Sequence, residues 1–197
     1  MGARSEIDRT PAQFTAAVEQ IRHAVLRPEV VVDEMPAPQR IAPHAFAISG
    51  DVLVGEDDLA TGRFILLHDP AGNDAWGGTF RCVTFARADI EADMAADPVL
   101  PSVGWSWLTE ALTAYGSDYT AASGSVTVVR SEGFGEMAAD GSDAQIEMRA
   151  SWTPLTEPPT PGMESHAAAW SNLLCAIAGL PPLAPGVIPL QRRRGPR

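Results

Sequence analysis

The sequence predicts an α+β protein in which helices cover one face of a single, mainly antiparallel sheet of about five strands. Apolar residues recur at helical spacing in some segments and alternate with polar residues in others. These segments follow one another in the order α-βββ-α-ββ-α, which a two-layer fold accounts for. With 197 residues, 45% of them hydrophobic, the chain is long enough to bury one core. We therefore expect one domain over residues 11–190, between a disordered N-terminus (1–10) and a basic, disordered tail (191–197).

The first helix is expected over residues 11–26. Thr10 precedes Pro11, a pattern typical of helix starts, and apolar side chains from Phe14 to Val25 form one stripe. Pro28 ends this helix. Three consecutive valines and three further prolines follow, which favours a short edge strand and then an extended crossing segment.

Three strands of an antiparallel meander are expected near residues 44–54, 62–68 and 78–87, because polar turns separate these apolar runs. A second helix follows, capped by Ser102 and ended at Gly116. Within it, Trp105 and Trp107 lie about 200° apart around the axis, so both cannot point to the centre of one core. We expect Trp105 at a margin, where another element, the tail or a partner covers it.

Two more strands are expected near residues 121–131 and 143–153. The second alternates cleanly, which predicts a sheet with one wet face. Its inward residues are Ile146, Met148, Ala150 and Trp152, and its outward residues are Gln145, Glu147, Arg149 and Ser151. A third helix over 163–178 carries an apolar stripe that includes Trp170, and Gly179 ends it.

Charge and composition limit the function classes. The net charge is −11, and four of the 14 arginines lie in the last seven residues, so the body before them is more acidic still. Such a body repels phosphate backbones, and only Arg192, Arg193 and Arg194 remain as a nucleic-acid contact. The chain has no lysine, which excludes Schiff-base chemistry, pyridoxal phosphate attachment and a phosphate-loop lysine.

We expect no cofactor and no metal site. Cys82 and Cys175 lie far apart in apolar segments and read as buried, reduced thiols. The four histidines show no metal-binding spacing. The N-terminus lacks an apolar signal core and no apolar run is long enough to span a bilayer, so the sequence predicts a soluble cytoplasmic protein without membrane contact.

The segment HDPAGNDAWGGTFR, residues 68–81, is the best candidate for a reaction site. His68 beside Asp69 or Asp74 has the makings of a general base, and Trp76 would close a pocket. The structural alternative is also complete, because aspartate, proline, asparagine and glycine together satisfy turn chemistry, with Trp76 packed over the hairpin. We favour the turn.

Three segments carry a family resemblance: RPEVVVDEMPAPQRIAPHA, LATGRFILLHDPAGNDAWGGTFRCVTFARADIEADMAADPVLPSVGWSWL and LLCAIAGLPPLAPGV. Together they resemble the actinobacterial family known as Domain of Unknown Function 3000, from about residue 12 to 194. The resemblance implies an intracellular actinobacterial protein and carries over no catalytic residue. Separately, the element order resembles the secretion-chaperone-like fold, whose small, acidic, often dimeric members bind polypeptides; this is an analogy of architecture.

Three functions follow from these patterns. The favoured one is a non-enzymatic interaction or adaptor module, which uses the wet sheet face, Trp105 and the apolar tail 180–190 to bind a second copy or a protein partner. The second is an enzyme on a small polar substrate, with His68 as base. The third is a weakly nucleic-acid-associated regulator that acts through the arginine tail.

Overall fold

The computed structural model describes residues 10–155 and 162–183. Residues 1–9 of the expected N-terminal extension and the whole tail 191–197 lie outside the described residues. In chain order the elements are α1 (Ala12–His23), β1 (Val30–Met35), β2 (His44–Val54), β3 (Asp57–Asn73), β4 (Gly78–Ile90), α2 (Ala92–Ala95), α3 (Leu100–Ala114), β5 (Tyr119–Glu132), η1 (Gly135–Asp140), β6 (Ser142–Pro154) and α4 (Met163–Ile177).

One antiparallel sheet contains all six of these strands, in the order β1-β2-β3-β4-β6-β5. The predicted count of five strands is therefore wrong. The difference is β1, which was expected as a separate edge strand and which pairs with β2 from Val30↔Val52 to Met35↔Ala47. Without β1, the backbone groups of β2 on that side would lack partners. The expected likeness to the secretion-chaperone-like fold stays a prediction.

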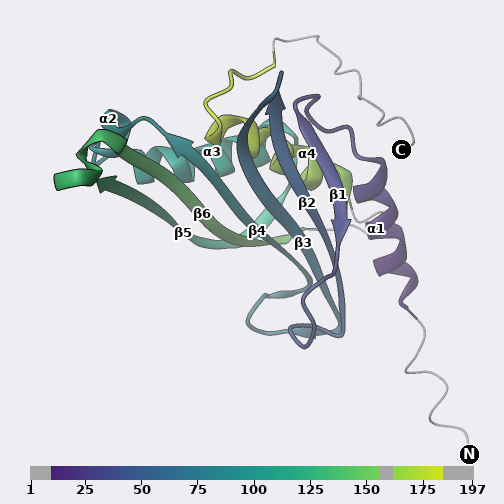
Figure 1. The fold of residues 1–197 in the computed structure, drawn as a ribbon. Helices are drawn as coiled ribbons and strands as arrows, with labels where there is room; N and C mark the ends of the chain where they lie inside the picture. The colour runs from purple at the N-terminus through teal and green to yellow at the C-terminus, as the bar shows by residue number, and fades with distance from the viewer. Residues whose placement is uncertain (1–9, 156–161, 184–197) are drawn as a thin grey trace, which may run out of the picture.

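The helices cover one face of the sheet, as expected. α4 packs on every strand except β5 and also on α3, α1 packs on α4, and α3 also contacts β5 (Figure 1). Figure 1 shows the strands curving together, with α3 and α4 behind them. The opposite face carries no described helix. We call the covered side the inner face and the other side the open face.

Helix ends differ from the sequence expectation. α1 begins after Pro11, which makes no side-chain cap, and it ends at His23 rather than at residue 26. Ser102 lies inside α3 and caps nothing; α3 begins at Leu100, and Asp97 accepts a hydrogen bond from the Val99 amide just before it (2.9 Å). This carboxylate thus fixes the turn that leads into α3, whose own first turn has no side-chain cap.

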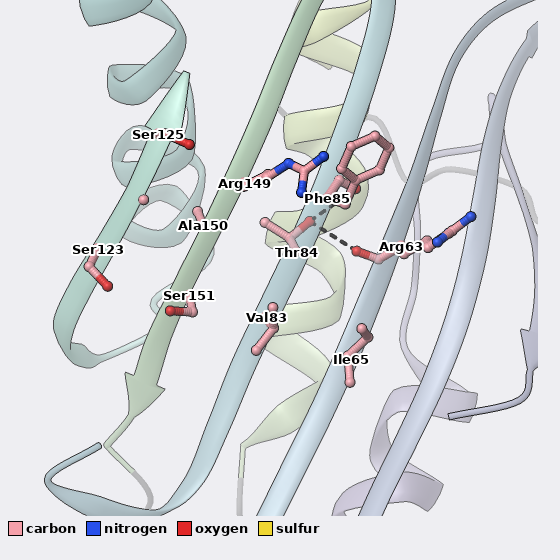
Figure 2. A pocket seen from close by; sticks show the side chains of 11 residues that line it. Arg63, Ile65, Val83, Thr84, Phe85, Ser123, Ser125, Arg149, Ala150 and Ser151 are labelled. Atoms are coloured by element: carbon pink, nitrogen blue, oxygen red, sulfur yellow. Dashed lines mark hydrogen bonds between the residues drawn. The ribbon is translucent and has the colours of Figure 1, made fainter. Parts of the chain in front are cut away.

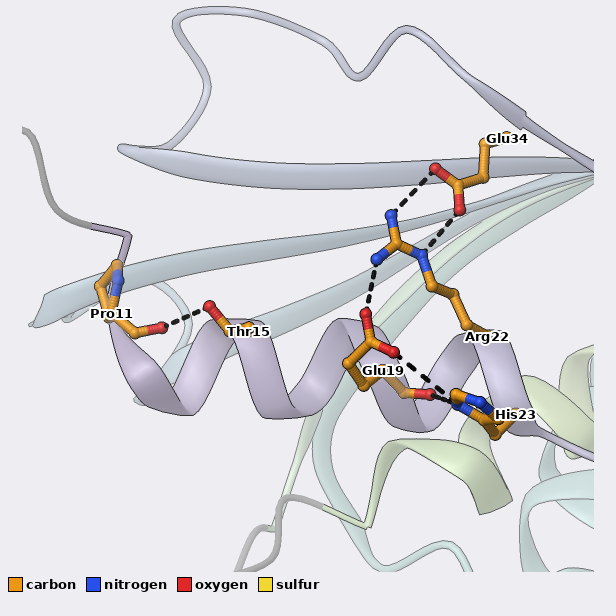
Figure 3. Close-up of polar contacts among 6 residues, drawn as sticks. All are labelled: Pro11, Thr15, Glu19, Arg22, His23 and Glu34. Atoms are coloured by element: carbon orange, nitrogen blue, oxygen red, sulfur yellow. Dashed lines mark hydrogen bonds and ion pairs between the residues drawn. The ribbon is translucent and has the colours of Figure 1, made fainter.

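A cluster of polar contacts joins α1 to β1. Arg22 donates from Nε to Glu34 of β1 (2.7 Å) and from Nη1 to Glu19 one turn earlier (2.6 Å) (Figure 3). All three side chains are about half exposed, so solvent screens these ion pairs and their contribution is small. The burial of Phe14, Ala17 and the rest of the apolar stripe holds α1 in place.

Two glycines let α4 approach the sheet closely. Gly50 of β2 and Gly62 of β3 are directly paired across the strands. A Cβ at Gly50 would lie 2.7 Å from Cη2 of Trp170, and a Cβ at Gly62 would overlap the end of Leu174. The bare backbone at these two positions therefore makes the depression that Trp170 and Leu174 fill.

This fit gives a prediction for a double-mutant cycle. Gly50→Ala is expected to lower the free energy of unfolding by about 1–3 kcal/mol, because the new methyl group meets the Trp170 ring. In a Trp170→Phe background the same change should cost less, since phenylalanine has no Cη2, with a coupling of at least about 0.5 kcal/mol. Urea unfolding of the wild type, the two single variants and the double variant measures this coupling. Additive losses would show that Trp170 is not the group that Gly50 accommodates.

Candidate functional site

His68 lies on the inner face, in register between His44 and Phe80. Its ring stacks on Phe80 with centroids 4.1 Å apart and lies 5.9 Å from the ring of Phe14 in α1. The side chain is buried, with 1% of the residue exposed. His68 is therefore part of the core between the sheet and α1.

Hydrogen bonding fixes the tautomer of His68. Nδ1 lies 2.9 Å from the Thr79 carbonyl oxygen, which only accepts, so Nδ1 carries the proton. Nε2 is buried and has no partner among the described residues. Burial lowers the pKa of His68, which keeps the ring neutral.

The carboxylates of the turn do not join His68. Asp69 accepts a hydrogen bond from the Ala71 amide (3.1 Å), and Asn73 accepts one from the Ala75 amide (3.0 Å), both typical turn contacts. Asp74 is exposed. In the described residues no hydrogen bond or ion pair links either aspartate to His68, so the geometry favours the turn interpretation of this segment.

The open face carries a hollow of about 740 Å³ across β3, β4, β6 and β5. Successive side chains of a strand point to opposite faces of the sheet, so every second side chain of these strands points into the hollow. Its lining consists of Arg63, Ile65, Val83, Thr84, Phe85, Ser123, Gly124, Ser125, Arg149, Ala150 and Ser151 (Figure 2). The sequence predicted Arg149 and Ser151 on this wet face, and both are there.

Phe85 is the aromatic centre of the hollow. The guanidinium carbon of Arg149 lies 5.5 Å from the ring centroid, and that of Arg63 lies 6.0 Å away on the other side. Figure 2 shows the Arg149 guanidinium directed toward Phe85. Arg149 also donates from Nε to Glu147 (2.7 Å), two residues earlier in β6. Its remaining N–H groups have no protein acceptor among the described residues.

Arg81 lies next to the hollow and is 7% exposed. It donates from Nη1 to the Ala121 carbonyl and the Thr153 hydroxyl (both 2.9 Å), and from Nη2 to the hydroxyls of Ser151 (2.8 Å) and Ser123 (3.2 Å). Within the described chain no carboxylate pairs with it. Burial accordingly lowers the pKa of Arg81. A buried cation solvated only by neutral oxygens thus borders the open face.

Sequence reasoning missed Arg81 and Ser123. A usable signal was present, because Arg81, Val83 and Phe85 alternate with buried Cys82 and Thr84, which places an arginine on the outward side of a central strand. The partners of Arg81 come from β5 and β6, far along the chain, and no local pattern indicates them.

Trp76 and Trp105, the two tryptophans that the sequence offered as binding candidates, are both half-buried. Trp105 packs on β5, where a Cβ at Gly124 would lie 2.9 Å from Cζ3 of Trp105, so another element of the same chain covers it. Trp107 was expected in the buried stripe and is also only half-buried. Trp76 lies in the β3–β4 turn, and its carbonyl accepts a hydrogen bond from the Thr153 hydroxyl (2.6 Å).

The remaining candidates add no site. Cys82 and Cys175 are free thiols in the core. Among residues 10–155 and 162–183, no group of three histidine, cysteine, aspartate or glutamate side chains is arranged to hold a metal ion, and no helix is long and apolar enough to cross a membrane. Arg192, Arg193, Arg194 and most of the apolar tail 180–190 lie outside the described residues.

These observations define a class: an α+β protein whose six-stranded antiparallel sheet is covered by helices on one face and bears an arginine- and serine-lined hollow on the other. Residues 10–188 match the model of the family described as "Protein of unknown function (DUF3000)", so the chain belongs to the DUF3000 family. The chain matches no curated protein and no solved structure at significant similarity.

Proposed function

We propose that the protein is a non-enzymatic interaction module that binds a polypeptide partner on the open face of its sheet. The observation that carries this proposal is the hollow around Phe85, which lies on a face that no described helix covers. Its floor is apolar at Ile65 and Val83, and Arg149 lies beside the ring. An aromatic residue next to arginine is the composition typical of interface centres.

The shape of the hollow favours a polypeptide. Pockets for small molecules bury about 70–90% of the ligand surface. This hollow is open along one side and touches only one face of an occupant, as protein interfaces do. The net charge of −11 does not oppose an acidic partner at contact, because salt screens exposed charges beyond about 8–10 Å and the nearest charges are those of the arginines.

The enzyme alternative has less support from the geometry. Its base, His68, is 1% exposed and lies on the inner face, whereas the hollow lies on the open face. Its orienting groups, Asp69 and Asp74, make no hydrogen bond or ion pair with the His68 ring among the described residues. The nucleic-acid alternative depends on Arg192, Arg193 and Arg194, and it stays a prediction.

A charge reversal with a matched control tests the proposed function. Arg149 and Arg130 each lie two residues from a glutamate on a strand and pair with it, but only Arg149 lines the hollow. The full chain is immobilised, and proteins captured from native lysate are quantified by mass spectrometry. We expect Arg149→Glu to reduce the recovered partner at least about 10-fold, since the local charge changes sign.

Arg130→Glu should leave the captured partner within about 2-fold of the wild-type amount, because an exposed charge far from the contact changes binding little. Capture of the same proteins in equal amounts by wild type, Arg149→Glu and Arg130→Glu would contradict the proposal. Self-association of the wild type that is lost only in Arg149→Glu, measured by sedimentation, would identify a second copy as the partner.

A further inference from the structure

The hydroxyl groups beside Arg81 have protons to donate. A guanidinium has donors only, so Ser123 and Ser151 accept from Arg81 and their own O–H protons are directed elsewhere. Neither hydroxyl donates a hydrogen bond to another group of the described residues. Thr153 differs from the two serines: its hydroxyl also accepts a hydrogen bond from Arg81, but it donates its own proton to the Trp76 carbonyl oxygen.

Both free donors belong to the hollow. Ser123 and Ser151 are paired across β5 and β6, and Figure 2 shows their side chains directed toward one another at the wall of the hollow. Arg149 follows one step along the same face and has N–H groups that Glu147 does not use. Serine and arginine donors thus converge from two strands, with a buried positive charge behind the hydroxyls.

An acceptor with negative charge complements this arrangement. Hydrogen bonds from a hydroxyl to an ionised oxygen are about twice as strong as neutral ones. The Arg81 charge, which no carboxylate of the described chain compensates, attracts an anion from close range. Next to these donors, the side chains of Val83, Ile65 and Phe85 offer apolar surface for the group that carries the anion.

The charge of the surroundings favours a monoanion. Glu147 already lies 2.7 Å from Nε of Arg149 and neutralises part of its charge. A phosphate group with nearly two charges would meet the repulsion of the Glu147 carboxylate more strongly than a carboxylate does.

We infer that Ser123, Ser151 and Arg149, supported by Arg81, form a carboxylate subsite within the hollow, which takes an acidic side chain or the C-terminal carboxylate of the bound polypeptide. The apolar floor takes the adjoining apolar or aromatic group. This inference rests on the proposed function, because it names the chemistry by which the open face recognises its partner.

Benzoate is the probe, because it joins one carboxylate to one ring. It is titrated into the ¹⁵N-labelled full chain, with shifts of backbone amides and of arginine Nε–H followed by NMR. We expect saturable shifts at Ser123, Ser151 and Arg149. Benzyl alcohol, the neutral analogue, should bind at least about 10-fold more weakly, and phenyl phosphate should bind more weakly than benzoate.

Variants assign the donors. The double variant Ser123→Ala and Ser151→Ala should lower the affinity for benzoate about 10-fold. Ser125 also lines the hollow but does not contact Arg81, so Ser125→Ala is the matched control and should change this affinity less than about 2-fold. If the double variant unfolds, Arg149→Gln replaces it, because this side chain is 68% exposed and leaves the Arg81 contacts intact. Arg149→Gln should also lower the affinity for benzoate. Arg87→Gln should not, because Arg87 lies on the same face of β4 but opposite Glu147 and outside the lining of the hollow.

Each outcome decides the inference. Shifts outside the hollow, equal binding of benzyl alcohol or phenyl phosphate, or full affinity in the alanine and glutamine variants would overturn it. If benzoate fails while capture of a partner remains sensitive to Arg149→Glu, the carboxylate subsite is wrong and the proposed function stands. If benzoate binds as expected and no partner is captured, the carboxylate subsite stands and the proposed function is wrong.

Discussion

Replacing Trp170 with alanine is expected to lower the free energy of unfolding by about 3–5 kcal/mol, the largest loss from any single substitution considered for this protein. The Trp170 side chain is completely buried, lies over Gly50 and contacts Phe64 with ring centroids 5.8 Å apart. Alanine would leave a cavity between α4 and the sheet. Neither partner can fill it, because Gly50 has no side chain and Phe64 is held from the other side by Trp152 (6.1 Å).

The loss comes from packing alone. The indole N–H of Trp170 has no hydrogen-bond partner among the described residues, so truncation breaks no hydrogen bond. Trp170→Phe should therefore cost clearly less than Trp170→Ala, since it keeps most of the ring and removes a buried polar group. Leu155→Ala, at a side chain that is 56% exposed, is the control and should stay within about 0.5 kcal/mol. Urea unfolding measures all three, and equal losses for alanine and phenylalanine would refute the cavity argument.

Acid should destabilise the protein through His166. Its Nδ1 accepts a hydrogen bond from the indole N–H of Trp152 (3.1 Å) inside the core, so the folded state requires a neutral ring. Burial lowers the pKa of His166 from 6.5 to about 4. The unfolded chain takes up a proton near pH 6.5 and the folded chain does not, so stability is complete above that pH and decreases as the pH falls toward about 4.

The size of this effect follows from linkage. From about pH 7 to about pH 5, His166 alone should remove about 2 kcal/mol from the free energy of unfolding. His68 acts in the same direction, because burial lowers its pKa as well. The measurement is urea unfolding at a series of pH values for wild type and His166→Gln, with His23→Gln as the matched control at an exposed histidine. A wild-type slope that persists unchanged in His166→Gln would show that another group is responsible.

The sequence predicted local structure well where a pattern is repeated. The alternation in β6 placed Ile146 and Trp152 inward and Arg149 and Ser151 outward, and the structure confirms all four. α4 begins at Met163 as expected. Such patterns succeed because the period of a strand or helix is set by the backbone of neighbouring residues.

The errors lie where distant segments compete. β1 was counted outside the sheet because its proline-rich flank resembles a crossing segment, and only the pairing with β2 makes it the sixth strand. β4 begins at Gly78 as expected, whereas β3 continues to Asn73, five residues beyond its expected end at residue 68. The pairing with β4 goes from His68↔Phe80 directly to Asn73↔Gly78, so residues 69–72 form an irregularity that the turn residues shape.

The sequence by itself determined the fold class, most of the buried helix stripes and which side of β6 faces solvent, because these depend on spacing between near neighbours. Tertiary structure alone decided strand order and register, and with them that Ser123, Ser151 and Arg81 meet at one hollow while His68 is enclosed by Phe14 and Phe80. The physical reason is that pleating is a local property of the backbone, whereas register results from long-range pairing and the packing of a shared core.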